Sequence, residues 1–291
     1  MKLAAFDDTH VGIVEDDVIF DVTSILPALP DRPPIFMDVL IDQWPNLQTA
    51  LFAAKREAAA LPLDEVRLMA PSPAPMHLVA APANYHKHVN ELGSLGSGGR
   101  TMRDLGFFLK APSSLLAAGG TILLPRGSSR NFHHECELAV VIGKRTKNIS
   151  PADALSSVFG YSCLMDITMR VTEDLREERV LRKSFDTFTP FGPWIVTADE
   201  IPDPQRLKLS LHVNGELRQD ATSAEMVLSV AEQISYISSV MTLEPGDVLA
   251  TGTPGGVGPI HPGDTIRIDI ERIGGFQVSV AEAPEVAPKE F

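Results

Sequence analysis

Two glutamates that lead directly into an apolar run constrain the fold of this chain more than any other feature. Glu135 and Glu137 flank Cys136, and residues 138–142 are all aliphatic before Gly143. Such a run predicts a strand that enters the core. Because side chains alternate along a strand, both glutamates lie on one face. Two adjacent buried carboxylates repel one another, and a divalent cation with oxygen ligands, such as Mg²⁺, relieves that repulsion.

A third carboxylate, Asp166, closes another apolar segment, residues 160–165. The three acids together offer the oxygen ligands of a metal site. The alternative is that all three lie on solvated strand ends, which is the more common fate of an arbitrary Glu-x-Glu pair. Here the pair adjoins a core run and does not alternate with polar residues, so both alternatives stay open on this pattern alone.

Composition excludes several classes of protein. The chain has 291 residues, 25 of them basic and 38 acidic, for a net charge of −13. This acidity argues against partners such as nucleic acid or an anionic membrane. We expect no membrane span and no signal peptide, because no apolar stretch approaches the ~20 residues that a span needs. Cys136 and Cys163 both lie in apolar segments, which favours reduced core thiols in a cytoplasmic protein.

The chain divides into two predicted units. Residues 1–70 form a small N-terminal domain, with a hairpin at residues 11–20 and helices around residues 35–41 and 47–60. A proline-rich linker leads into a catalytic domain over residues 71–291. The 23 prolines and 21 glycines indicate many turns and hence many strands. We therefore predict an α+β fold that is predominantly β.

Three further helices are predicted in the larger unit. One begins at the Ser150-Pro151 cap, and a charged one covers residues 168–181. The third follows a capping box formed by Thr222 and Glu225, with an apolar stripe that continues to Met241.

His88 and Glu91 are candidates for acid–base chemistry. Three residues apart on a helix, they lie on the same face, and a carboxylate beside an imidazole fixes its tautomer and raises its basicity. A surface histidine beside an acid is the more common case. Position favours function, since the glycine- and serine-rich residues 93–99 follow directly and suit the arm of a lid.

Two basic residues follow Asp166. Lys183 precedes an aromatic patch and is placed to stabilise a developing oxyanion, or else to interact with the C-terminal dipole of a helix. Arg170 is placed to hold Asp166 or a substrate carboxylate, or else to pair with Asp174 on its own helix.

The segment 251–258 contains four glycines and two threonines after a short apolar strand. Glycines allow a ligand to approach the backbone closely, and the hydroxyls of Thr251 and Thr253 can donate to a carboxylate. The segment lacks the Gly-Lys-Ser/Thr ending of a phosphate loop. A tight turn in a β protein is the alternative. We assign His133 and His134 to the rim of the site, because they lack the spacing of a zinc motif.

Taken in order, these segments resemble the fumarylacetoacetate hydrolase superfamily, and in particular its bacterial acylpyruvase and isomerase members. The matching pieces are Asn84-Tyr85-x-x-His88-x-x-Glu91, Phe108-Leu109-Lys110, Glu135-x-Glu137 with residues 138–144, Gly160-Tyr161, Asp166-x-x-x-Arg170, Lys183-Ser184-Phe185-Asp186, Gly192-Pro193-Trp194, Val213-Asn214-Gly215-Glu216 and Thr251-Gly252-Thr253-Pro254. They extend from about residue 71 to residue 280.

The resemblance implies a β-sandwich roll, a homodimer and a bound Mg²⁺ or Mn²⁺. It implies that Glu135, Glu137 and Asp166 hold the metal, that His88 with Glu91 is the base on a mobile lid, and that Lys183, Thr253, Tyr85, Lys110 and Arg170 contact the substrate or its charge. The chain departs from the common pattern after Arg170, where Val171-Thr172-Glu173 replaces an aspartate and a later glutamine.

These features together predict a metal-dependent hydrolase that cleaves a C–C bond in a 2-oxo or 2,4-dioxo carboxylate of the acylpyruvate type, as in aromatic-compound catabolism. His88 activates water and Lys183 stabilises the oxyanion. One alternative is an enol–keto isomerase or decarboxylase of the 2-hydroxyhepta-2,4-diene-1,7-dioate type. Another is a non-catalytic metal- or carboxylate-binding protein, against which the histidine–glutamate pair argues, since binding alone needs no base.

Arg100 and Arg103 follow the glycine-rich segment directly. If the segment becomes helical, this spacing places both on one face, where an arginine fork suits a distal carboxylate of the substrate. The alternative is that both are solvated charges on an acidic protein.

Overall fold

One large sheet connects the N-terminal unit to the rest of the molecule. The computed structural model describes residues 1–27, 36–92, 99–171 and 178–286, and within them eleven strands form this sheet in the order β4-β3-β2-β1-β13-β11-β10-β16-β5-β6, with β7 paired to β13. Its strands are β1 (Lys2–Phe6), β2 (His10–Glu15), β3 (Val18–Asp21), β4 (Ala60–Pro62), β5 (Leu78–Ala80), β6 (Phe108–Lys110), β7 (Leu115–Leu116), β10 (Cys136–Ile142), β11 (Val158–Met165), β13 (Thr189–Thr197) and β16 (Val248–Ala250).

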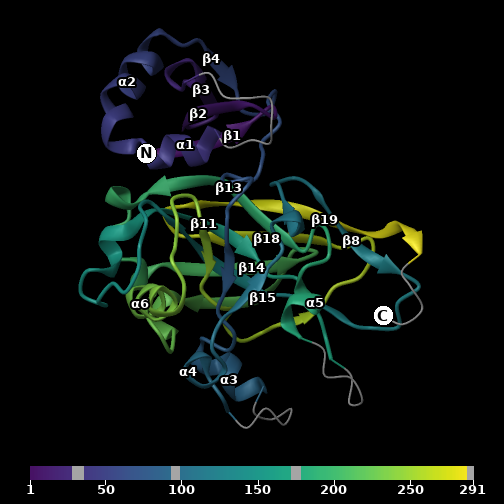
Figure 1. Cartoon of the computed structure of the whole chain (residues 1–291). Coiled ribbons are helices and arrows are strands. Elements are labelled where there is room, and N and C mark those ends of the chain that lie inside the picture. The colour runs from purple at the N-terminus through teal and green to yellow at the C-terminus, as the bar shows by residue number, and fades with distance from the viewer. Residues whose placement is uncertain (28–35, 93–98, 172–177, 287–291) are drawn as a thin grey trace.

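The predicted hairpin near the N-terminus is confirmed as the antiparallel pair β2–β3. The connection to the larger unit is made by β1, which pairs with β13 through Lys2 opposite Val196. In Figure 1 the N-terminal strands and helices lie together at one end of the molecule. The domain boundary near residue 70 stays a prediction.

Two smaller sheets complete the β structure. The first has the order β15-β14-β18-β19-β8 and the second β12-β9-β17. Their strands are β8 (Thr121–Arg126), β9 (Phe132–His134), β12 (Thr168–Met169), β14 (Lys208–Val213), β15 (Glu216–Thr222), β17 (Gly258–Pro259), β18 (Thr265–Ile270) and β19 (Gly274–Val286). The architecture confirms the predicted α+β fold with a predominance of strands.

The aliphatic run after Glu137 is buried on both faces, which is why it does not alternate with polar residues. Leu138 and Val140 of β10 pack in a cluster with Ile268 of β18. On the opposite face, Ala139 and Val141 join a second cluster with residues of the N-terminal unit. The strand is therefore packed between two hydrophobic clusters and is buried along its whole length.

The helices lie outside the sheets. They are α1 (Phe36–Asp42), α2 (Trp44–Glu57), α3 (His86–Leu92), α4 (Met102–Leu105), α5 (Arg179–Lys183) and α6 (Val230–Val240). The two helices predicted in the N-terminal unit correspond to α1 and α2. Over the described ranges, no helix has both the length and the apolarity needed to cross a membrane.

The capping box at Thr222 and Glu225 exists, but it caps a 3-10 turn and not the long helix predicted from it. Helix α6 begins after a second capping box, formed by Ser229 and Glu232. The delay has a tertiary cause, because Asn84 accepts hydrogen bonds from the backbone of the intervening residues, through its carbonyl from residue 227 and through its side chain from Leu228. These bonds hold the segment extended.

The other two predicted helices are also wrong in part. Residues 168–169 form strand β12, which pairs with β9, and α5 begins only at Arg179. Residues 172–177 of the predicted helix lie outside the described residues. The Ser150 cap leads to a 3-10 turn over Ala154–Ser157, since the chain must enter strand β11 at Val158.

Candidate metal centre and adjoining histidine–glutamate pair

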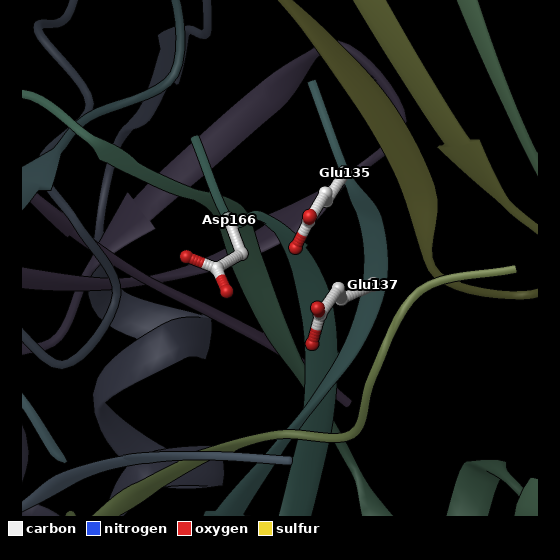
Figure 2. A group of neighbouring side chains, drawn as sticks. All are labelled: Glu135, Glu137 and Asp166. Carbon is white, nitrogen blue, oxygen red and sulfur yellow. The ribbon is translucent and has the colours of Figure 1, made fainter. Parts of the chain in front are cut away.

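Strand register brings the three acidic residues together. Strands β10 and β11 are antiparallel, with Cys136 opposite Met165, and the next pair outward is Glu135 and Asp166, whose backbone N–H donates to the Glu135 carbonyl at 3.0 Å. Directly opposed residues project from the same face of a sheet. One oxygen from each of Glu135, Glu137 and Asp166 lies within 4.8 Å of the others, and Figure 2 shows the three carboxyl groups extending into the same space.

The triad is buried and surrounded by cations, so the carboxylates do not lie on solvated strand ends. Glu135, Glu137 and Asp166 are 4%, 1% and 1% exposed. The Lys183 ammonium donates to Glu135 Oε2 at 2.7 Å and to Asp166 Oδ2 at 2.5 Å. Lys110 donates to Asp166 Oδ1 at 2.5 Å. These ion pairs hold the acidic side chains in place from two sides.

The two glutamates differ in electrostatic setting. Burial by itself would raise the pKa of Glu135. The positive charges of Lys183 and Arg170 lower it by a larger amount, so the net shift of the pKa is downward. Arg170 reaches Glu135 Oε1 at 2.8 Å. Burial raises the pKa of Glu137, and the charges of Asp166 and Glu135 raise it more. A divalent cation among these oxygens removes that repulsion, and three carboxylates are the hard donors that Mg²⁺ and Mn²⁺ accept.

The glycine-rich segment after β16 approaches the triad closely. The Gly252 N–H donates to Glu137 Oε2 at 2.7 Å. Its φ is +96°, and a Cβ at this position would lie 2.7 Å from Asn84 Cβ. Asn84 is itself fixed, because its amide donates to the carbonyls of Thr251 and Leu228. Glycine is therefore required both by the backbone angle and by the neighbouring chain.

His88 and Glu91 lie on one face of α3, as predicted. His88 Nδ1 is 3.4 Å from Glu91 Oε2, and the other oxygen of Glu91 accepts from the Gly256 N–H at 2.8 Å. His88 is 5% exposed. Burial lowers its pKa below the ordinary value, and the charges of Glu135 and Glu91 offset this only in part. The lowered pKa favours the neutral imidazole, the state that a general base requires.

The expected substrate-contacting residues have differing surroundings. Lys110 is turned to Asp166 and to the Phe188 carbonyl, and Arg170 to Glu135, so both hold metal-site carboxylates. Asp174, the other partner considered for Arg170, lies outside the described residues. Tyr85 is fully buried in the core, and its hydroxyl has no hydrogen-bond partner among the residues described. Thr253 is 3% exposed and accepts from an amide of Gln219.

The two arginines do not share a helix. Arg103 lies in α4, whose capping box is formed by Thr101 and Asp104, and it donates to Glu232 of α6 at 2.9 Å. Arg100 precedes the cap and is exposed. Of the glycine-rich stretch predicted to form the lid arm, residues 93–98 lie outside the described residues.

Two buried polar residues lie beside the triad: Gln219, which sequence reasoning missed, and His134, which it assigned to the rim. Gln219 of β15 and His134 of β9 are both 0% exposed, and His134 is therefore not a rim residue. His134 Nδ1 lies 3.0 Å from Gln219 Oε1. The available signal for Gln219 was a polar residue only three positions after the Val213–Glu216 motif. Its side-chain hydrogen bonds with His134 of β9 and Cys136 of β10 join segments distant in sequence, so no local pattern reveals them.

Comparison with known proteins places the chain in one family. The model of the family described as "Fumarylacetoacetate (FAA) hydrolase C-terminal" matches residues 77–281. Maleylpyruvate hydrolase from Aquipseudomonas alcaligenes is 40% identical over 289 residues, which cover 96% of this chain and 99% of that protein.

Two solved structures extend the comparison. Maleylpyruvate hydrolase from Sphingobium sp. SYK-6, in complex with a manganese(II) ion and pyruvate, is 41% identical with a TM-score of 0.86 and covers 97% of this chain and 100% of its own. The 2-hydroxyhepta-2,4-diene-1,7-dioate isomerase from Mycobacterium marinum is 30% identical with a TM-score of 0.73, over 98% of this chain and 100% of its own. The chain described here belongs to the fumarylacetoacetate hydrolase family.

Proposed function

We propose that this chain is a metal-dependent hydrolase that cleaves a C–C bond of an acylpyruvate, a 2,4-dioxo acid of the maleylpyruvate or fumarylpyruvate kind. The observation that carries the proposal is the buried carboxylate triad with the buried His88, paired to Glu91, on the adjoining helix. Full-length similarity to two maleylpyruvate hydrolases, one of them with manganese and pyruvate, supports the substrate class.

In this proposal Glu135, Glu137 and Asp166 hold Mg²⁺ or Mn²⁺. The bound ion supplies Lewis-acid stabilisation for the enolate oxygen of the pyruvate half. Lys183, held within hydrogen-bonding distance of two of these carboxylates, presents positive charge beside the same space. It stabilises the negative charge that develops on the substrate as the bond breaks.

His88 provides the base. Its Nδ1 faces Glu91, so the proton on Nδ1 is held by the carboxylate and Nε2 is left to accept a proton from water. The water oxygen bonds to the distal carbonyl carbon, and the C–C bond to the pyruvate carbon then breaks. Its electron pair passes to the pyruvate enolate. The proton collected by His88 returns to the enolate carbon, which gives pyruvate and the second carboxylic acid.

A panel of substrates tests this assignment. Purified protein with Mn²⁺ is given maleylpyruvate, fumarylpyruvate, acetylpyruvate and 2-hydroxyhepta-2,4-diene-1,7-dioate, and the products are identified by mass spectrometry. We expect release of pyruvate from the acylpyruvates. A product of unchanged mass from the dienedioate, without pyruvate release, would favour the isomerase alternative instead. Binding without turnover of any compound would favour the non-catalytic alternative.

Variants test the metal site. Glu137→Gln and Asp166→Asn should each lower Mn²⁺ affinity sharply, because each removes one of three charged ligands. Glu65→Gln, at an exposed position of the N-terminal unit, is the matched control and should bind Mn²⁺ as the wild type does. Full activity after exhaustive chelation would refute a metal-dependent mechanism.

The assembly and location of the protein are part of the proposal. We infer a homodimer and a cytoplasmic location, supported by the family resemblance and, for the location, by two buried free cysteines. Light scattering coupled to size-exclusion chromatography measures the mass in solution, and a monomeric mass at micromolar concentration would contradict the dimer.

A further inference from the structure

Gln219 connects the strand that carries the metal ligands to the segment that carries Thr253. Its Oε1 accepts from the Cys136 N–H at 2.9 Å and from His134 Nδ1 at 3.0 Å. Its Nε2 donates to the Pro254 carbonyl at 2.9 Å and to Thr253 Oγ1 at 2.8 Å. The side chain is completely buried. Cys136 lies between the two glutamates of the triad, so this amide bonds both the strand that carries them and the segment that carries Thr253.

The orientation of this amide follows from its neighbours. The Cys136 N–H can only donate, so it must face the amide oxygen, and the Pro254 carbonyl can only accept, so it must face the amide nitrogen. The same logic places a proton on His134 Nδ1, since that nitrogen also faces the oxygen. Both amide hydrogens are thus assigned, one to Pro254 and one to Thr253.

This orientation of the Gln219 amide restricts the Thr253 hydroxyl. Because its oxygen accepts a hydrogen bond from Gln219, its own hydrogen must point elsewhere. In the part of the chain that the structure describes, the Thr253 hydroxyl has no hydrogen-bond acceptor. The preceding residue, Gly252, donates its N–H to Glu137, which places Thr253 beside the metal ligands. The hydroxyl therefore presents a donor that none of the described residues uses.

We propose that Gln219 is a positioning residue that forces the Thr253 hydroxyl to donate to an oxygen of the bound 2-oxo acid. The inference rests on the proposed function, since it assumes that a pyruvate-type ligand occupies the site. In this arrangement Gln219 sets the direction of the Thr253 hydroxyl hydrogen, and that direction affects the affinity for the ligand. A hydroxyl whose hydrogen pointed to residue 219 would turn a lone pair toward the anionic ligand and repel it.

Two substitutions at residue 219 distinguish positioning from packing. Gln219→Glu nearly preserves shape but turns the donor facing Thr253 into an acceptor, so the hydroxyl hydrogen is drawn toward residue 219. Gln219→Met removes the donor and leaves the hydroxyl free to point either way. We expect Gln219→Glu to weaken pyruvate binding to the Mn²⁺-loaded protein by roughly 10- to 100-fold, the range for a lost hydrogen bond to a charged group, and Gln219→Met to have a smaller effect.

The same substitutions are then made with Thr253→Val. Without the hydroxyl, neither change at residue 219 should weaken pyruvate binding further. Calorimetry gives the pyruvate Kd, and thermal unfolding is recorded for every variant. Gln205→Glu is the control, because this amide also bonds two backbone groups, the Ser223 carbonyl and the Val230 N–H, away from the triad. It should lower the Tm and leave the pyruvate Kd unchanged.

Each outcome decides the inference. Equal losses from Gln219→Glu and Gln219→Met that persist with Thr253→Val would mean that Gln219 acts by packing alone, and would overturn it. Wild-type protein that binds pyruvate but cleaves no acylpyruvate would refute the proposed function, while the Kd series would still decide the role of Gln219. Wild-type protein that fails to bind pyruvate would refute both.

Discussion

Gly252→Ala is the substitution whose effect the structure defines most closely, because a matched glycine exists elsewhere in the chain. Gly252 and Gly263 both have a φ of +96°. A Cβ on Gly263 would meet no atom within 4 Å, whereas one on Gly252 would lie 2.7 Å from Asn84 Cβ and 3.3 Å from the Ala81 carbonyl oxygen. The pair separates the cost of the backbone angle from the cost of the contact.

The angle alone should cost about 1–2 kcal/mol of unfolding free energy in either variant. At Gly252 the contact adds roughly 1–3 kcal/mol, because Asn84 is tied to the backbone of two other segments and cannot move aside cheaply. To relieve this contact the backbone at residue 252 must move, and with it the N–H that donates to Glu137. Loss of such support around a metal ligand typically lowers metal affinity about 10–100-fold.

Urea unfolding of the metal-free proteins measures the two stabilities, and electron paramagnetic resonance of free Mn²⁺ measures metal affinity. We expect Gly263→Ala to lose a little stability and to bind Mn²⁺ as the wild type does. Gly252→Ala should lose more stability and should also bind Mn²⁺ more weakly. Equal stability losses with unchanged Mn²⁺ affinity would refute the role assigned to the close approach of this segment.

Three further predictions concern a base, a buried acid and two arginines. His88→Ala should lower kcat by roughly 10²–10⁴ with Mn²⁺ affinity near wild type, and loss of metal binding would instead make His88 a ligand. Burial raises the pKa of Asp38 in α1 from 3.8 to about 7. The folded protein then holds this proton more tightly than the unfolded chain, so stability falls as pH rises through that window. Asp38→Asn should flatten this dependence in urea midpoints measured on both sides of the window, whereas Asp42→Asn, exposed on the same helix, should not. If Arg100 or Arg103 binds a distal carboxylate, its replacement by alanine should lower kcat/KM for fumarylpyruvate more than for acetylpyruvate, and equal effects would contradict this role.

Local patterns predicted several features that the structure confirms. The alternation of side chains put Glu135 and Glu137 on one face, and helical spacing put His88 beside Glu91. These relations span two and three residues, and the backbone geometry of a strand or a helix enforces them wherever the element forms. The glycines of residues 251–258 predicted close backbone approach to a ligand, which stays a prediction. At Gly252 the structure shows a close approach to Asn84 and a φ that favours glycine.

Local signals failed where a distant segment competed for the same backbone groups. The capping box formed by Thr222 and Glu225 is present, but no long helix follows it directly. Asn84, which is distant in sequence, accepts a hydrogen bond from the Leu228 N–H, so the helix begins later. Thr168 and Met169 lie in a segment whose sequence predicts a helix, but they pair with β9 and form a strand. Intrinsic propensity is a weak preference that such tertiary hydrogen bonds override.

Patterns in the amino-acid sequence predicted the family, the predominance of strands and the three acidic residues that could hold a metal. How these carboxylates are held depends on the tertiary fold. Lys110 reaches Asp166 across 56 positions of sequence, and Gln219 reaches Cys136 across 83. Such contacts depend on strand order and register, which arise from the packing of the whole chain and are not encoded in any short pattern. The direction in which Thr253 donates is therefore a property of the fold and not of its local sequence.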